Sequence, residues 1–177
     1  MTRAIRPAII AGVLVLAGCA SGPPPGPSPE SVAWVDGVCG AVRPFVEAVA
    51  AGPATDGADA AAAIRSLSTF LDTGATKIDS SIAALNSIGP SPVPGGDEIL
   101  ARMREDYTAQ RTALRDAKAG VDVIDVANPE TLATGLPAAL QSLPPTLDPT
   151  KDLRSNTTLA EAVTASPVCE ALPDTAG

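Results

Sequence analysis

Length, composition and charge indicate a single-domain protein that does not bind nucleic acid. The chain has 177 residues, enough for one domain with a real core, and its formal net charge of −8 repels phosphate backbones. It contains no histidine, which excludes Ser-His-Asp and Cys-His catalytic arrangements and most zinc sites. Aromatic residues make up only 2% of the chain, and a core of small aliphatic side chains favours packed helices over sheets.

The first 18 residues have the pattern of an export signal. Arg3 and Arg6 precede an apolar run over residues 8–17. This run is too short to cross the roughly 30 Å hydrocarbon core of a bilayer, but it is typical of a secretory signal peptide. We therefore expect residues 1–18 to be a signal peptide; an uncleaved membrane helix is the alternative.

A lipid-attachment motif ends this segment. The residues Leu16-Ala17-Gly18-Cys19 resemble the lipobox of bacterial lipoproteins, which has an aliphatic residue, two small residues and a cysteine. The resemblance implies cleavage before Cys19, attachment of diacylglycerol to the Cys19 sulfur and often acylation of the new N-terminus. Two or three acyl chains anchor a protein stably, whereas one does so only marginally. An ordinary secretory signal with an unmodified cysteine is the alternative.

Residues 19–29 predict a tether between the lipid and the folded part. Half of the residues from Ala20 to Pro29 are proline, which favours an extended polyproline conformation. At about 3 Å per residue, such a segment is a semi-rigid spacer of roughly 30 Å. The remaining residues, 30–177, are expected to form one helical domain.

The first predicted helix covers residues 30–51. Apolar residues recur there every three or four positions, which is the helical period. Pro44 lies inside this stretch and should kink the helix, with its ring directed at Gly40, the residue that obstructs it least. Trp34 is expected to anchor the core; a platform for a ligand is the alternative.

Two longer helices should follow as an antiparallel hairpin. Residues 59–88 carry a sustained heptad pattern, in which Gly74 occupies a seam position and would let another helix approach closely. A Pro/Gly-rich turn over residues 89–96 stops this helix. Asp97 and Glu98 then begin the next helix with negative charge at its N-terminus, where the helix dipole favours it.

The last third of the chain is less regular. Asn128-Pro129 predicts a helix start, and Pro137 should interrupt the leucine pattern that follows. Residues 158–161 have the form of a capping box before a short helix. The predicted fold is therefore all-α: an up-and-down four-helix bundle with a broken fourth helix.

The cysteine count predicts a disulfide. If Cys19 carries lipid, Cys39 and Cys169 remain, and an even pair in an exported protein implies a bridge. Closing so long a loop contributes roughly 4–5 kcal/mol in the chain-entropy model. The alternative is a pair of reactive or metal-binding thiols, which the absence of histidine and the apolar helical setting of Cys39 disfavour.

One face of the second long helix carries four basic residues at spacings of seven, four and three: Arg104, Arg111, Arg115 and Lys118. This basic face is a candidate binding surface for an anionic glycan or lipid headgroup. It can also pair with acids on the preceding helix, where Asp72 and Asp79 lie seven apart. We expect pairing.

Oxygen-bearing side chains cluster where this helix ends: Asp122, Asp125, Asn128 and Glu130. A calcium site needs six to eight oxygen ligands, often on a loop shaped by glycine, and the sequence has no such loop here. We expect a solvated acidic helix end, and no metal or cofactor.

These patterns favour a membrane-anchored extracytoplasmic protein without catalytic activity. The Ala/Val/Pro-rich composition, the lipobox, Trp34 before Cys39 and the late Cys169 resemble the small helical lipoproteins of actinobacteria. The resemblance implies attachment to the cell membrane through lipid on Cys19 and carries over no active site. We expect the bundle to bind or scaffold another envelope component, whether protein, glycan or lipid. The alternative is a carrier of a small apolar or lipid ligand held between helices.

Overall fold

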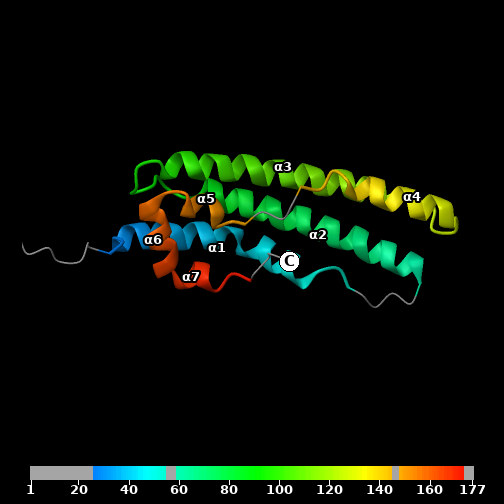
Figure 1. Cartoon of the computed structure of the whole chain (residues 1–177), viewed down its shortest axis with the longest axis horizontal. Helices are drawn as coiled ribbons and strands as arrows, with labels where there is room; N and C mark the ends of the chain where they lie inside the picture. Colours follow the sequence, from blue (N-terminus) through cyan, green and yellow to red (C-terminus); the bar gives the residue numbers. More distant parts are fainter. Residues whose placement is uncertain (1–25, 55–58, 145–147, 174–177) are drawn as a thin grey trace, which may run out of the picture.

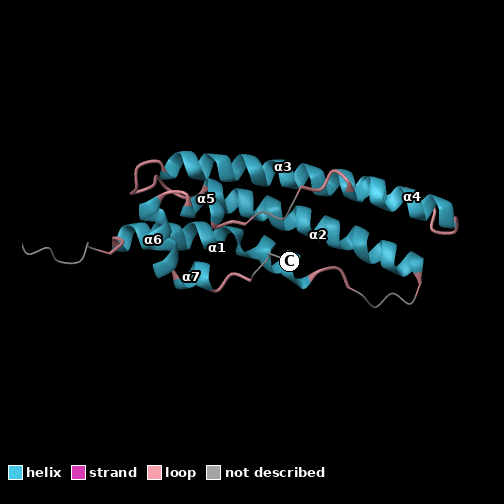
Figure 2. Ribbon diagram, viewed as in Figure 1, coloured by secondary structure: helices cyan, strands magenta, loops and turns pink. Residues whose placement is uncertain are grey.

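The computed structural model describes residues 26–54, 59–144 and 148–173, and within these ranges it contains helices and no strands (Figure 2). The predicted all-α class is confirmed. The signal peptide, Cys19 and the tether as far as residue 25 lie outside the described residues. The helices, in chain order, are α1 (Pro29–Ala51), α2 (Ala60–Asn86), α3 (Gly96–Asp122), α4 (Pro129–Leu140), α5 (Lys151–Arg154), α6 (Thr157–Ala165) and α7 (Pro167–Glu170).

Three long helices run alternately up and down the molecule (Figure 1). α2 packs against both α1 and α3. α4 folds back along the last part of α3, at one end of the molecule. α6 and α7 pack against α1, toward the other end of the molecule, where α1 begins. The fourth position of the bundle is thus divided between α4 at one end and α5–α7 at the other, as a broken fourth helix predicts. We call the end where α1 begins the tether end, and the end that carries the α3–α4 turn the far end. None of the described helices is both long and apolar enough to cross a membrane.

Two asparagines cap the later helices. The Asn128 side chain accepts hydrogen bonds from the backbone N–H groups of Glu130 and Thr131 and begins α4, as predicted. The capping box predicted at residues 158–161 is wrong. Asn156, not Thr158, is the N-cap of α6, and its side chain accepts from the N–H groups of Thr158 and Leu159. Asn is at least as strong an N-cap as Thr, so the earlier residue begins the helix.

Two prolines lie inside helices without ending them. α1 continues through Pro44, and α4 continues through Pro137 to Leu140. The predicted interruption at Pro137 is therefore wrong. This proline is on the exposed side of α4, where the carbonyl that loses its helical partner can face solvent. The fourth position of the bundle breaks later, between α4 and α5.

The turn between α2 and α3 is held from two other parts of the chain. Trp34 of α1 is 8% exposed, and its Nε1–H donates to the carbonyl of Gly89 at 3.0 Å. The Asn156 side chain, at the start of α6, donates to the carbonyl of Pro94 at 3.0 Å. Gly95 has φ +81°, a left-handed conformation that favours glycine. The role predicted for Trp34, an anchor in the core, is confirmed.

The core is complete at the tether end and incomplete at the far end. Buried apolar residues of α1 end at Val46, and those of α2 begin only at Leu71. Ile64, Leu67 and Phe70, in the first turns of α2, are partly buried. Figure 1 shows the reason: α2 and α3 extend past the end of α1, so one neighbouring helix is missing there.

A polar layer lies within this core. Ser81 of α2 and Tyr107 and Gln110 of α3 are buried, and each has a side-chain oxygen with no hydrogen-bond partner among the described residues. The Tyr107 ring meets Phe45 of α1 edge to face, with ring centroids 5.7 Å apart. Burial, together with the negative charge of Asp148, raises the pKa of Tyr107 above its ordinary value.

We expect Tyr107 to keep its proton until the protein unfolds. Because its folded-state pKa is raised, the contribution of Tyr107 to stability should be constant below about pH 10, the ordinary tyrosine pKa, and fall as the pH rises above it. Tyr107 is the only tyrosine, so phenolate absorbance reports this residue alone. Absorbance and circular dichroism should change together during alkaline titration. A phenolate signal near pH 10 in the still-folded protein would contradict the buried placement.

Candidate functional site

Every cation of the basic face has a partner within the protein. Arg111 and Arg115 of α3 donate to the two carboxylate oxygens of Asp79 on α2, at 3.0 and 2.6 Å. The pairing predicted with Asp79 is therefore confirmed. One carboxylate holds two guanidinium groups, and the contact ties α3 to α2 across the hairpin.

The other two cations differ from the prediction. Nη2 of Arg104 donates to the carbonyl of Leu85 at 2.6 Å instead of pairing with an acid. The carbonyls of a helix's last turn lack helical partners and carry partial negative charge, so they attract a cation. Lys118 pairs with Asp122 of its own helix at 2.5 Å. Among the described residues Asp72 forms no ion pair within 4.0 Å, although its charge contributes to raising the pKa of Lys118, after the larger effect of the Asp122 hydrogen bond.

The acidic cluster after α3 is used in structural contacts. Asp122 accepts hydrogen bonds from Lys118 and from the Ser68 hydroxyl of α2, and these bonds lower the pKa of Asp122. Asp125 accepts from the N–H of Ala127 within the turn, and Asn128 caps α4. The end of α3 is therefore bonded to α2 in addition to being solvated. No three acidic or cysteine side chains of the described ranges are grouped as metal ligands would be.

Reversing Arg111 and Arg115 to glutamate should lower the melting temperature, because Asp79 would then face two carboxylates. Exposed ion pairs contribute about 0–1 kcal/mol each, so we expect a loss of about 1–2 kcal/mol. Changing Asp79 to lysine in the doubly reversed chain should restore part of the lost stability. Asp72→Lys should restore less, because Asp72 has no direct contact with either arginine. Unchanged stability together with lost retention on an anionic glycan or lipid would identify the basic face as a binding surface.

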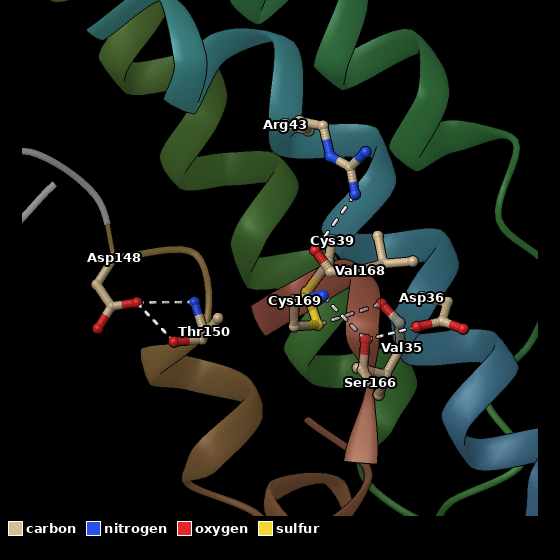
Figure 3. Close-up of a disulfide and its surroundings, with 9 residues drawn as sticks. All are labelled: Val35, Asp36, Cys39, Arg43, Asp148, Thr150, Ser166, Val168 and Cys169. Atoms are coloured by element: carbon tan, nitrogen blue, oxygen red, sulfur yellow. Dashed lines mark hydrogen bonds between the residues drawn. A yellow bond between two sulfur atoms is a disulfide. The ribbon is translucent and has the colours of Figure 1, made fainter. Parts of the chain in front are cut away.

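The predicted disulfide joins α1 to α7 (Figure 3). The Cα atoms of Cys39 and Cys169 are 5.2 Å apart, within the usual range for a bridge. Cys39 is fully buried and Cys169 is 7% exposed. Because both sulfurs are in the bond, neither residue offers a thiolate for nucleophilic chemistry or metal binding.

Hydrogen bonds hold the same segment on α1 (Figure 3). The Ser166 hydroxyl donates to Asp36 at 2.5 Å and accepts the N–H of Cys169 at 3.0 Å, which caps α7. Arg43 donates to the carbonyl of Val168 at 3.3 Å. Polar contacts therefore hold the C-terminal segment to α1 both before Cys39, at Asp36, and after it, at Arg43.

Apolar grooves occur at the far end. A groove of about 430 Å³ lies between the end of α1 and the first turns of α2, and no residue in its lining is charged. A second groove of about 430 Å³ lies between α3 and α4, where Asp116 is the charged residue in the lining. Both are open to solvent. Sequence reasoning did not identify them, since they arise where long helices extend past their neighbours.

No protein-family model, curated protein or solved structure matches this chain. Its function is therefore inferred from its own residues: the motif before the fold, the disulfide and the surfaces of the bundle.

Proposed function

We propose that this chain is a lipoprotein held at the extracytoplasmic face of the cell membrane through lipid on Cys19, and that its bundle binds or scaffolds another envelope component without catalysing a reaction. The observation that carries the proposal is the tetrapeptide Leu16–Cys19 after a short apolar run. The Cys39–Cys169 disulfide supports it, because such bonds persist in oxidising compartments outside the cytoplasm.

The arrangement of the bundle is consistent with a tethered binding module. Ser28 caps α1 and Pro29 is its first residue, so the folded part begins directly after the proline-rich sequence. A lipid attached before this point would leave the far end, with α4 and the apolar grooves, away from the bilayer. Each cation of the basic face already has an acceptor within the same chain, which favours binding of a partner through other surfaces.

A carrier of a small apolar or lipid ligand is the second candidate. The uncharged groove between α1 and α2 is the observation that favours it. A carrier purified from membranes should release a defined lipid at close to one molecule per chain on organic extraction. A scaffold should release only the mixed lipids of its surroundings.

Replacing Cys19 with serine should release the protein from the membrane or leave the uncleaved precursor. Serine has no thiol to accept diacylglycerol, and without acyl chains the tether has no apolar anchor. Membrane fractionation and the N-terminal mass of the product measure the result, and the matched control is Ser21→Ala in the tether. A Cys19→Ser chain that stays on the membrane with a mature, lipid-free N-terminus would refute the anchor.

A further inference from the structure

A small cavity lies between α3 and the segment that leads into α5. Its volume is about 20 Å³, which is room for one group the size of a water molecule or an ammonium head. Three aspartates, one tyrosine and two apolar residues line it: Asp106, Asp148, Asp152, Tyr107, Met103 and Pro149. We call it the aspartate cavity. α5 packs against the part of α3 nearer the tether end, so the cavity lies on that half of the bundle (Figure 1).

The Tyr107 hydroxyl is the buried polar group of this cavity. The side chain is 2% exposed, and its oxygen has no hydrogen-bond partner among the described residues. Asp148 lies near enough for its charge to add to the effect of burial on the pKa of Tyr107. A buried hydroxyl is unfavourable without a hydrogen-bond partner. Tyr107 therefore points to a ligand that brings a hydrogen-bond donor into the cavity.

The three aspartates surround the cavity with negative charge. Asp106 and Asp148 are exposed and Asp152 is partly buried. Within the described part of the chain, none of them forms an ion pair within 4.0 Å. One oxygen of Asp148 accepts from the N–H and the hydroxyl of Thr150, at 2.9 and 2.8 Å, which fixes this carboxylate in place (Figure 3). Three carboxylates around one cavity attract a cation.

The geometry favours a cation that binds by hydrogen bonds over a metal ion. A metal ion such as Ca²⁺ or Mg²⁺ needs oxygen ligands at about 2.0–2.6 Å. No three acidic side chains of the described ranges are grouped closely enough for that. An ammonium group forms longer bonds, of about 2.7–2.9 Å, so its acceptors can lie farther apart. It donates in several directions and accepts nothing, which matches carboxylates beside a phenol oxygen.

We propose that the aspartate cavity binds a primary ammonium group, supplied by a lysine side chain of a partner protein. Lysine carries its ammonium on a long uncharged stem, which can enter a narrow opening and pack against Met103 and Pro149. The planar guanidinium of arginine is too large for this volume. An ethanolamine headgroup holds a phosphate close to its nitrogen, which the carboxylates would repel, and an amino sugar attaches its nitrogen directly to a bulky ring. The partner lysine rests on the proposed binding function, whereas the ammonium site does not.

Titration of the full chain with n-butylammonium tests the site. Because Tyr107 is the only tyrosine, ¹³C-labelled tyrosine gives ring signals from this residue alone in a nuclear magnetic resonance spectrum. n-Butylammonium should shift these signals to saturation. Tetramethylammonium, which has the same charge but no N–H and a larger head, should not do so at equal ionic strength.

Two isosteric variants check which carboxylates bind the ammonium. Asp148→Asn keeps an oxygen for Thr150 and should weaken n-butylammonium binding about tenfold or more, because a charge-assisted bond is lost. Asp116→Asn removes an exposed charge of α3 outside this cavity and should leave the affinity nearly unchanged. No saturable shift, an equal shift with tetramethylammonium, or equal weakening in the two variants would overturn the site.

Carbodiimide coupling in membranes of the producing cells tests the source of the ammonium. The reagent joins a carboxylate directly to a primary amine in contact with it, and mass spectrometry identifies the amine. The chain should couple to a lysine of another protein, and this product should be largely lost in Asp148→Asn but not in Asp116→Asn. Coupling to an amino lipid or an amino sugar instead would overturn the lysine. Saturable n-butylammonium binding without any coupled partner would refute the partner lysine and the binding function while leaving the ammonium site.

Discussion

Replacing both Cys39 and Cys169 with alanine is expected to lower the free energy of unfolding by about 4–5 kcal/mol, the value of the chain-entropy model for so long a loop. The bond joins residues 130 positions apart, so it removes much of the conformational freedom of the unfolded chain. Alanine suits both sites because they are almost completely buried and a hydroxyl there would need a partner. Chemical denaturation of the parent and the variant measures the difference.

The variant should still fold. Ser166 keeps its bonds to Asp36 and to the start of α7, and Arg43 keeps the carbonyl of Val168, so the helical circular dichroism of the native protein should persist. Reductant is the matched control: it should reduce the stability of the parent to that of the variant and leave the variant unchanged. A parent chain equally stable with and without reductant would contradict a closed, stabilising bond.

Phe45→Ala should destabilise the protein far more than Phe70→Ala, although both changes remove the same atoms. Phe45 is 1% exposed and packs edge-on against Tyr107, so its removal leaves a cavity that the rigid tether-end core cannot fill. A loss of about 3–5 kcal/mol is typical of such a site. Phe70 is partly buried and lines an open groove at the far end, so we expect about 1–2 kcal/mol there.

Denaturant unfolding of the two phenylalanine variants measures this difference. Both the midpoint and the slope of the free energy of unfolding against denaturant concentration are compared. The slopes should agree, because both variants unfold from the same native structure. Equal losses of stability in the two variants would contradict the uneven core. A larger loss in Phe70→Ala would indicate that the groove between α1 and α2 is covered in solution.

Much of the secondary structure could be predicted from local pattern. The heptad over residues 59–88 predicted α2, which ends within two residues of the expected bounds. Gly74 was expected to allow close approach, and a Cβ there would lie 3.2 Å from Leu114 of α3. The cysteine count predicted the bridge, since the assignment of Cys19 to lipid leaves Cys39 and Cys169 as a single possible pair. These inferences hold because helix periodicity, capping and covalent pairing depend on few residues.

The candidate site was predictable only in part. Spacing placed the four cations on one face of α3, but it did not determine which acceptor each would reach. That choice depends on the register of α3 against α2, which brings Asp79 between Arg111 and Arg115 and places the carbonyl of Leu85 beside Arg104. A shift of one helical turn would exchange these partners without changing a single residue.

The sequence by itself determined the helical class, the long hairpin, the cap at Asn128 and the pairing of Cys39 with Cys169. The tertiary structure alone decided where the later helices lie, that α4 continues through Pro137, and that the core is complete at one end only. The physical reason is the distance along the chain over which the interactions act. A helix and its cap are set by interactions within a turn or two, whereas burial depends on which helices reach the same height in the bundle. Because α1 ends before the first turns of α2 are covered, the far end keeps apolar surface that the tether end encloses.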